Sequence, residues 1–178
     1  MNNQNDTLSV GSAFLNQSVE YLVNNYQPKI ERCLEQLSDE QIWWRPNPSS
    51  NCIGNLILHL CGNVRQWILS GLGNDPDHRV RDTEFEQTEV IPRADLEKLL
   101  DETLGAVKAL LETWPAETLL EHRKIQGKDV GVLEAVYHVT EHFAMHTGQI
   151  ITLTKLLAQK DLAFYNFDDT VPRERWRD

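Results

Sequence analysis

The chain has no long uninterrupted hydrophobic run. Its most apolar stretch, residues 52–72, is broken by Asn55, Asn63, Arg65 and Gln66. Polar and ionisable side chains are costly inside a bilayer and are rare in membrane-spanning helices. The sequence therefore predicts no membrane span, and residues 52–72 are interpreted as a buried core helix.

Basic residues are in the minority, with 17 Lys and Arg against 27 Asp and Glu and a formal net charge of −10. Binding to a nucleic-acid backbone needs clustered Lys and Arg, so this balance disfavours a polyanion as the main partner. A local arginine can still hold a small anion. We expect a small-molecule substrate and neither a nucleic-acid nor a membrane partner, and a homodimer is left open.

Cysteine is scarce, and the three residues Cys33, Cys52 and Cys61 form no Cys-x-x-Cys pair. An odd count without tight spacing argues against a disulfide framework and fits a reducing compartment. Residues 1–6 carry neither a basic region nor an apolar run, so we expect no secretory signal and a cytoplasmic protein. The Gly-rich phosphate loop and the Gly-x-Ser-x-Gly elbow are also missing.

Helical periodicity is what the chain does have. Apolar residues recur at helical spacing over four segments, about 12–37, 52–69, 92–114 and 130–159. The intervening residues 74–91 are polar and charged without a sustained period, which predicts a long connection. The pattern predicts an all-α single domain over residues 1–178, an antiparallel four-helix bundle with a long loop between helices 2 and 3.

Short polar motifs predict where these helices begin and bend. Residues 38–41, Ser-Asp-Glu-Gln, have the form of a capping box. Ser50 or Asn51 is the expected N-cap of the helix that follows, and Pro28 is expected to bend or split the first helix. The charged run over residues 79–89 is expected to be solvated.

Two histidines, His142 and His146, lie four residues apart in the last predicted helix. This spacing places both imidazoles on one helix face, one turn apart, and a helical wheel turns that face inward. His138 falls nearer the polar edge. Neutral imidazole is the commonest metal ligand, so the pair can grip one ion, although an inward pair also occurs as hydrogen-bonded core residues.

The second predicted helix is largely apolar, yet one stripe of it is polar, comprising Cys52, Asn55, His59, Asn63 and Gln66. Buried polar groups are unfavourable without partners, so this stripe implies water, a polar network or a metal pocket opposite it. If His59 joins the histidine pair, three neutral imidazoles form a site with open positions. Such a site is catalytic in type, because structural zinc is closed by four protein ligands.

Several segments resemble the DinB/YfiT-like superfamily: Trp44-Arg45-Pro46, Ile53-Gly54, Leu58-His59-Leu60 and residues 142–149, His-Phe-Ala-Met-His-Thr-Gly-Gln. The run over residues 77–85 resembles a feature of one subgroup of unassigned function. The resemblance spans roughly residues 12–160 and implies a four-helix bundle that holds one divalent metal through His59, His142 and His146. Many relatives have a further histidine just before the last ligand, where this chain has Met145.

The resemblance also implies a chemistry. Characterised relatives include thiol-dependent S-transferases and an isomerase that uses low-molecular-weight thiols, and some members are classed as hydrolases. We therefore expect a metal-dependent enzyme, first of all a thiol-dependent S-transferase acting on small electrophiles with a low-molecular-weight thiol as cosubstrate. A metal-dependent hydrolase and a non-enzymatic metal-binding stress protein are the alternatives. Three imidazoles suit zinc, nickel and iron about equally. We expect zinc or nickel, with iron or manganese as further candidates.

Four polar side chains are candidates to orient the ligands or to contact the substrate, namely Asn55, Asn63, Gln149 and Arg45. No general base can be assigned from the sequence. Glu141 adjoins His142, but the helical wheel points its carboxylate away from the inward face.

Overall fold

The computed structural model describes residues 9–166 and 173–175. The expected absence of a secretory signal concerns residues outside these ranges. The helical elements are α1 Val10–Tyr21, η1 Leu22–Tyr26, α2 Gln27–Leu34, α3 Asp39–Ile42, α4 Ile53–Val64, η2 Arg65–Ser70, α5 Arg81–Glu86, α6 Arg93–Glu112, η3 Ala116–Thr118 and α7 Val132–Ala158. The strands are β1 His122–Ile125, β2 Lys128–Gly131, β3 Tyr165–Asn166 and β4 Arg173–Glu174.

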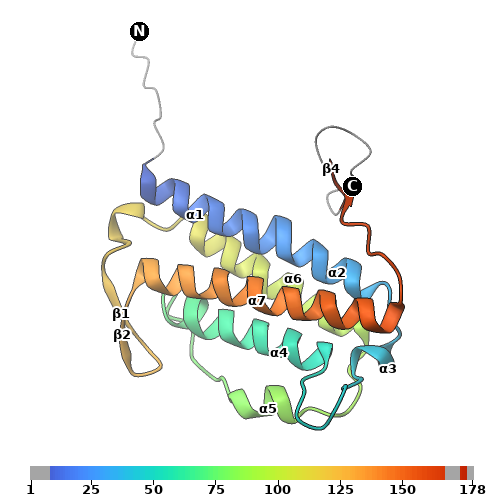
Figure 1. The fold of residues 1–178 in the computed structure, drawn as a ribbon. Coiled ribbons are helices and arrows are strands. Elements are labelled where there is room, and N and C mark those ends of the chain that lie inside the picture. The colour runs from blue at the N-terminus through green and yellow to red at the C-terminus, as the bar shows by residue number, and fades with distance from the viewer. Residues whose placement is uncertain (1–8, 167–172, 176–178) are drawn as a thin grey trace.

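The structure is mostly helical, with long helical segments lying side by side (Figure 1). Helix α7 packs against α2 and α4, and α6 packs against α1 and α4. Apolar side chains from these helices fill the space between them, and Phe143 of α7 is completely buried there. No described helix is both long and apolar enough to cross a membrane.

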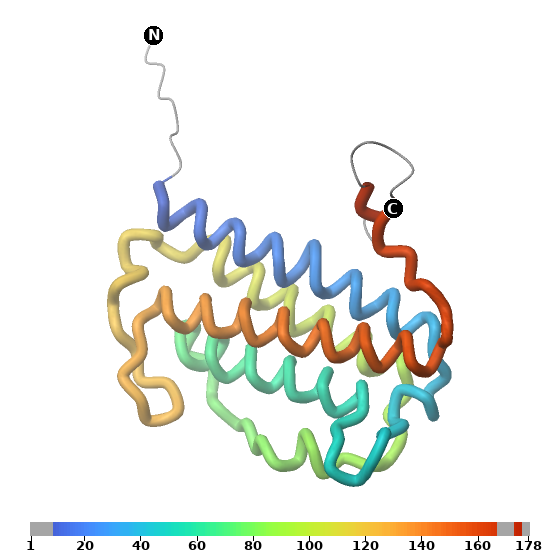
Figure 2. The backbone as a smooth tube through the Cα atoms, in the orientation of Figure 1, coloured from blue at the N-terminus to red at the C-terminus, as the bar shows by residue number. Residues whose placement is uncertain are grey.

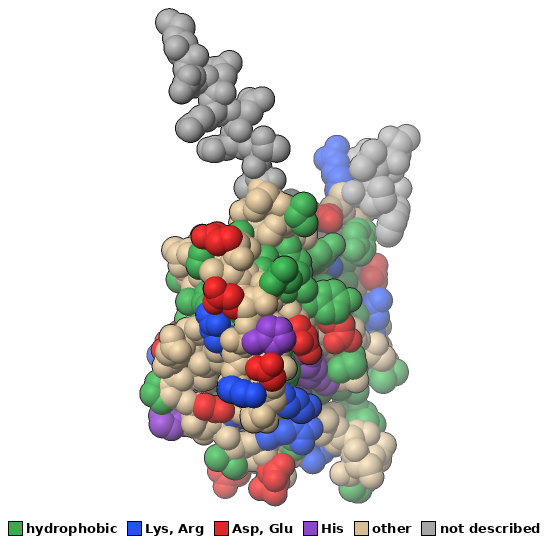
Figure 3. All heavy atoms as spheres, turned by 90° about the vertical axis from the view of Figure 1, so that its left-hand side faces the viewer, with side chains coloured by type: hydrophobic (Ala, Val, Ile, Leu, Met, Phe, Trp, Pro, Cys, Tyr) green, Lys and Arg blue, Asp and Glu red, His purple; other side chains and the backbone are tan. Residues whose placement is uncertain are grey.

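Strands form only short antiparallel pairs, β1 with β2 and β3 with β4, among the described residues. The β1–β2 pair closes through Gln126 and Gly127, whose φ angles are positive, at 53° and 75°. Figure 3 looks at the end of the molecule that carries this hairpin. Acidic and basic side chains are interspersed there, without a continuous basic surface.

The first helical segment is split where proline occurs, as predicted. The π-turn η1 ends just before α2, and Pro28 lies in the first turn of α2. A wide turn suits this position because proline lacks the N–H that would otherwise bond to the preceding turn. The Gln27 N–H bonds back to the carbonyl of Leu22, which gives the five-residue spacing of a π-turn.

The predicted capping box is confirmed at α3, where the Gln41 N–H donates to Ser38 Oγ and the Ser38 N–H donates to Gln41 Oε1. The expected N-cap of α4 is wrong. Cys52 occupies that position, and its Sγ accepts from the Asn55 N–H at 3.4 Å. Ser50 belongs to the preceding turn because its N–H bonds to the Asn47 carbonyl.

The long connection between η2 and α6 also differs from expectation, because it contains α5. Figure 2 shows this segment in green, running along the outer side of α4. Helix α5 packs directly against α4. The connection therefore covers the polar stripe of α4, which the sequence predicted to face something polar.

Gly54 sets the approach of α4 to Trp43. A Cβ at Gly54 would lie 2.7 Å from atoms of the Trp43 ring, and that ring is held by a 3.0 Å bond from its Nε1 to the Ile91 carbonyl. We expect Gly54→Ala to lower the free energy of unfolding by about 1–3 kcal/mol, as overpacking does. Urea denaturation of the variant and the unmodified protein measures this difference in the free energy of unfolding.

Gly105 of α6 provides the matched control, since a Cβ there would meet no atom within 4 Å. Gly105→Ala should stabilise the protein by about 0.5–1 kcal/mol, because alanine loses less backbone entropy than glycine in a helix. Equal unfolding midpoints for the two variants would contradict the close packing at Trp43.

Candidate metal centre

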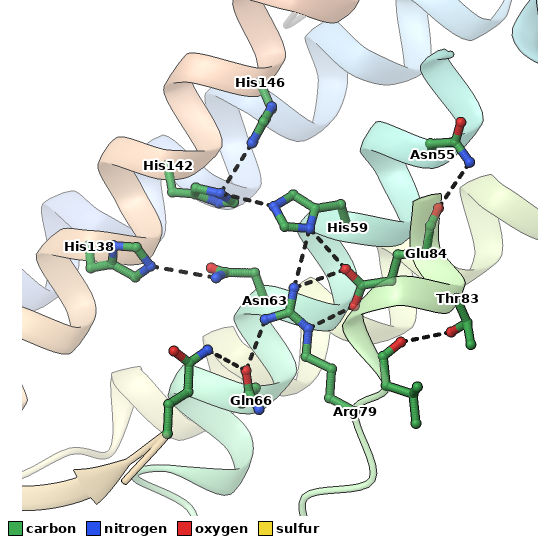
Figure 4. A network of polar contacts seen from close by, with 12 residues as sticks. Asn55, His59, Asn63, Gln66, Arg79, Thr83, Glu84, His138, His142 and His146 are labelled. Carbon is green, nitrogen blue, oxygen red and sulfur yellow. Dashed lines mark hydrogen bonds and ion pairs between the residues drawn. The ribbon is translucent and has the colours of Figure 1, made fainter. Parts of the chain in front are cut away.

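Three histidines converge between α4 and α7 (Figure 4). The Nε2 atom of His142 lies 3.1 Å from Nε2 of His59 and 3.1 Å from Nε2 of His146. One nitrogen from each ring lies within 4.8 Å of the others, and the three residues form a group that could hold a metal ion. Two zinc–nitrogen bonds of about 2.0–2.1 Å at a tetrahedral angle separate their nitrogens by about 3.3 Å. The spacing therefore fits a single ion.

His138 lies one turn away from this cluster and is half-buried. Its ring packs against Trp67 with centroids 4.1 Å apart, and its Nε2 lies 3.5 Å from Asn63 Nδ2. It precedes His146 by two turns, about 12 Å along the helix axis. His138 thus borders the site, and its exclusion from the ligand set stays a prediction.

Glu84 determines which nitrogen of His59 carries the proton. His59 Nδ1 lies 2.8 Å from Glu84 Oε2, and Arg79 contacts the same carboxylate at 2.7 and 2.9 Å. Although burial opposes it, hydrogen bonds from Arg79 and His59 hold the pKa of Glu84 below its usual value. Arg79 Nη2 also lies 3.2 Å from His59 Nδ1, but it donates to Glu84 Oε2 at the shorter distance of 2.9 Å. The carboxylate can only accept, so the 2.8 Å contact makes Nδ1 the donor and Nε2 keeps its lone pair.

Gln149 does the same for His146. The His146 Nδ1–H donates to Gln149 Oε1 at 2.7 Å, which leaves the Nε2 lone pair of His146 for a ligand bond. Such contacts to the second imidazole nitrogen are typical of metal-binding histidines. Burial lowers the pKa of His146, and burial together with neighbouring histidines lowers that of His142 to about 3, so both rings are in the neutral form that binds metals.

The polar contacts of His142 are incomplete without a cation. Its Nδ1 is buried and has no hydrogen-bond partner, while its Nε2 faces the Nε2 atoms of both His59 and His146. A proton on His142 Nε2 can be donated to one of these neighbours, and the lone pair of the other neighbour is then left without a donor. A divalent ion would satisfy all three, so the donor set fits the metal that the resemblance implies.

The expectation that residues 79–89 are solvated is wrong for Arg79 and Glu84, whose side chains are 6% and 9% exposed. They are buried because they neutralise each other against the polar stripe of α4. The absence of a side chain at Gly62 leaves space for the Glu84 carboxylate, with which a Cβ at this position would collide. Arg79 also donates from Nη1 to Gln66 Oε1 at 2.9 Å. The polar stripe and Gly62 were the sequence signals for this docking, but neither names its partner.

Asn55 and Arg45 contact α5 and Gln87, the residue that follows it. Asn55 Nδ2 donates to the carbonyls of Glu84 and Gln87. Arg45 Nη2 donates to Asn55 Oδ1 at 2.9 Å and to the Phe85 carbonyl at 3.0 Å. Both side chains hold α5 against α4 and so act on the histidines through Glu84.

Asn63 and Gln149 lie closer to the cluster than Asn55 and Arg45 do. Asn63 is one turn beyond His59 on α4, and its Oδ1 is buried without a hydrogen-bond partner. Gln149 contacts His146 directly. Glu141 is exposed, in agreement with the helical wheel.

Comparison with known proteins places the chain in a family. The sequence profile of the family described as "Protein of unknown function (DUF1572)" matches residues 9–173. No curated protein matches the chain.

Solved structures share the fold at low sequence identity. A conserved protein from Enterococcus faecalis has a TM-score of 0.68 and 18% identity, covering 82% of this chain and 97% of its own. A DinB-like protein from Bacillus cereus has a TM-score of 0.60 and 20% identity, with coverages of 80% and 90%.

A third structure is the DinB-like protein YjoA from Bacillus subtilis, with a TM-score of 0.63, 18% identity and coverages of 82% and 94%. These likenesses agree with the fold that the resemblance implies. The chain belongs to the DUF1572 family of proteins of unknown function, and its fold is shared with DinB-like structures.

Proposed function

We propose that the protein is a metal-dependent enzyme whose divalent ion is held by His59, His142 and His146. The observation that carries the proposal is the convergence of the three Nε2 atoms. Glu84 sets the tautomer of the His59 ring, and Gln149 sets that of the His146 ring. Three protein ligands leave at least one coordination position open, which is the arrangement of catalytic rather than structural sites. Zinc or nickel is the expected ion.

The proposed reaction is transfer of a low-molecular-weight thiol to a small electrophile. An ion in this site would lower the pKa of a thiol or water in its open position. The sulfur then bonds to the electrophilic atom, while the thiol proton and the leaving group depart. Glu84 and Gln149 would keep the His59 and His146 rings oriented through this step.

The proposal extends to the helix arrangement, the cellular location and the oligomeric state. We infer a single domain with an antiparallel four-helix bundle, in which facing helices build the site. A cytoplasmic location and a homodimer stay predictions. Size-exclusion chromatography with light scattering measures the assembly directly.

A cobalt-substituted sample tests the thiol step. The protein should bind about one ion per chain, and adding 2-mercaptoethanol should produce a new sulfur-to-cobalt absorption band in the near ultraviolet. The same thiol should be consumed faster when 1-chloro-2,4-dinitrobenzene is added as the electrophile. Absorption spectra and thiol titration record both effects.

The His59→Ala variant is the control and should show neither effect. If no cellular thiol changes the spectrum while water-dependent ester hydrolysis proceeds, the hydrolase alternative replaces the transferase. If metal binds but neither reaction occurs across a broad substrate panel, the protein is better described as a non-enzymatic metal-binding protein.

A further inference from the structure

A cavity of about 560 Å³ lies next to the histidine cluster. Its walls come from the loop 46–51, from Leu56 of α4 and from residues 145–153 of α7. The volume falls within the range of about 300–1,000 Å³ that is usual for small-molecule sites. Neither the metal proposal nor the family assignment gives this cavity a ligand.

Gln149 connects the cavity to the proposed metal site. It lines the cavity, and its Oε1 accepts the hydrogen bond from His146 Nδ1. Leu56 lies about one turn before His59 on α4, and Met145 directly precedes His146 on α7. The cavity wall thus includes residues within about one helical turn of the proposed ligands, and Gln149 contacts His146 directly.

The chemical character of the cavity is uncharged. Among the described residues that line it, none is Asp, Glu, Lys, Arg or His. The charged residues on the other side of His59, Arg79 and Glu84, are paired with each other. A charged ligand would lose hydration without gaining a counter-ion, whereas an uncharged one would not.

The walls also define which uncharged groups fit. Leu56, Met145 and Leu153 offer apolar surface, and Met145 is a flexible side chain that is 48% exposed. Because the Oε1 of Gln149 is engaged by His146, its amide nitrogen is a donor that can meet a ligand. The loop side of the wall adds further uncharged polar groups from Ser49, Ser50 and Asn51. The cavity thus suits an uncharged molecule that has an apolar part and at least one hydrogen-bond acceptor.

We propose that this cavity binds the uncharged organic body of the substrate, with the Gln149 amide nitrogen donating to a carbonyl or similar acceptor. The inference rests on the proposed function, which it extends by naming the substrate class. Gly148 lines the cavity, and a Cβ at this position would project into open space, with no atom within 4 Å. Filling that space should block the cavity without disturbing the histidines.

Met145 offers a direct reporter. Met1 and Met145 are the two methionines of the chain, so a sample labelled with [methyl-¹³C]methionine has one methyl resonance from the cavity wall, assigned with Met145→Leu. Benzamide should shift this resonance saturably. Benzoate, which has the same shape and a negative charge, should bind about tenfold more weakly or worse.

Gly148→Phe should abolish the benzamide response, with Gly148→Leu as a second variant of the same kind. Gly105→Phe is the matched control, since Gly105 also lies in a helix with open space around its Cβ, and it should respond like the unmodified protein. All variants exchange glycine for a better helix former, so the helices should persist.

Three results would overturn the inference. The Met145 resonance would shift with neither compound, would shift equally with both, or would still shift with benzamide in Gly148→Phe. The measurement needs neither thiol nor turnover. Failure of the proposed function would appear instead as missing metal or a missing thiol band, so the two failures are distinguishable.

Discussion

Replacing His142 by alanine should abolish binding of the proposed divalent ion, whereas replacing His138 should leave about one ion bound per chain. His142 is central, because its Nε2 lies 3.1 Å from the Nε2 atoms of both His59 and His146. Loss of a residue that merely orients a ligand already costs about 10–100-fold in metal affinity. Loss of this ligand should therefore cost more than about 100-fold.

Elemental analysis of untagged protein and competition with a chromophoric chelator measure the effect. Metal should also raise the melting temperature of the unmodified protein, since the unfolded chain has no preformed site, and this increment should vanish in His142→Ala. His138→Ala is the matched control from the same helix. Equal loss of metal from the two variants would show that the assigned ligand set is wrong.

Replacing Glu84 by alanine should weaken both the fold and the metal site. It leaves the Arg79 guanidinium, whose side chain is 6% exposed, without its partner carboxylate. Breaking a buried ion pair in this way typically costs about 3–5 kcal/mol of unfolding free energy. His59 also loses the acceptor of its Nδ1 proton, so metal affinity should fall by about 10–100-fold.

A double variant separates the two effects. Arg79→Met with Glu84→Leu removes both charges and keeps apolar volume, so the stability should recover relative to Glu84→Ala. Metal affinity should stay low, because His59 still lacks its acceptor. Urea unfolding and chelator competition measure the two quantities. Unchanged metal affinity in both variants would show that Glu84 does not orient His59.

Local features of the fold were predictable because their causes are local. The capping box at Ser38 and the helix break at Pro28 depend on hydrogen bonds between residues a few positions apart. The inward direction of His142 and His146 follows from helical periodicity. The N-cap of α4 was missed because the thiol of Cys52 takes the place of the commoner side-chain hydroxyl, and the side chain of Asn55 completes the capping box.

Burial of the loop residues could not be predicted in the same way. A charged run is expected to be solvated unless the partner of each charge is known, and the contacts of Arg79 lie on three elements, at Glu84, Gln66 and His59. The polar stripe of α4 indicated that something polar would lie opposite. Which side chains would fill that position depended on how α5 packs.

The sequence by itself determined the helical class, the polar stripe and the pair of inward histidines, since each is a periodic pattern within one segment. The tertiary structure decided that His59 meets this pair and that Glu84 and Gln149 set the tautomers. It also decided that a cavity without charged walls lies beside them. These features depend on which helix faces which, and packing between segments far apart in the chain sets that.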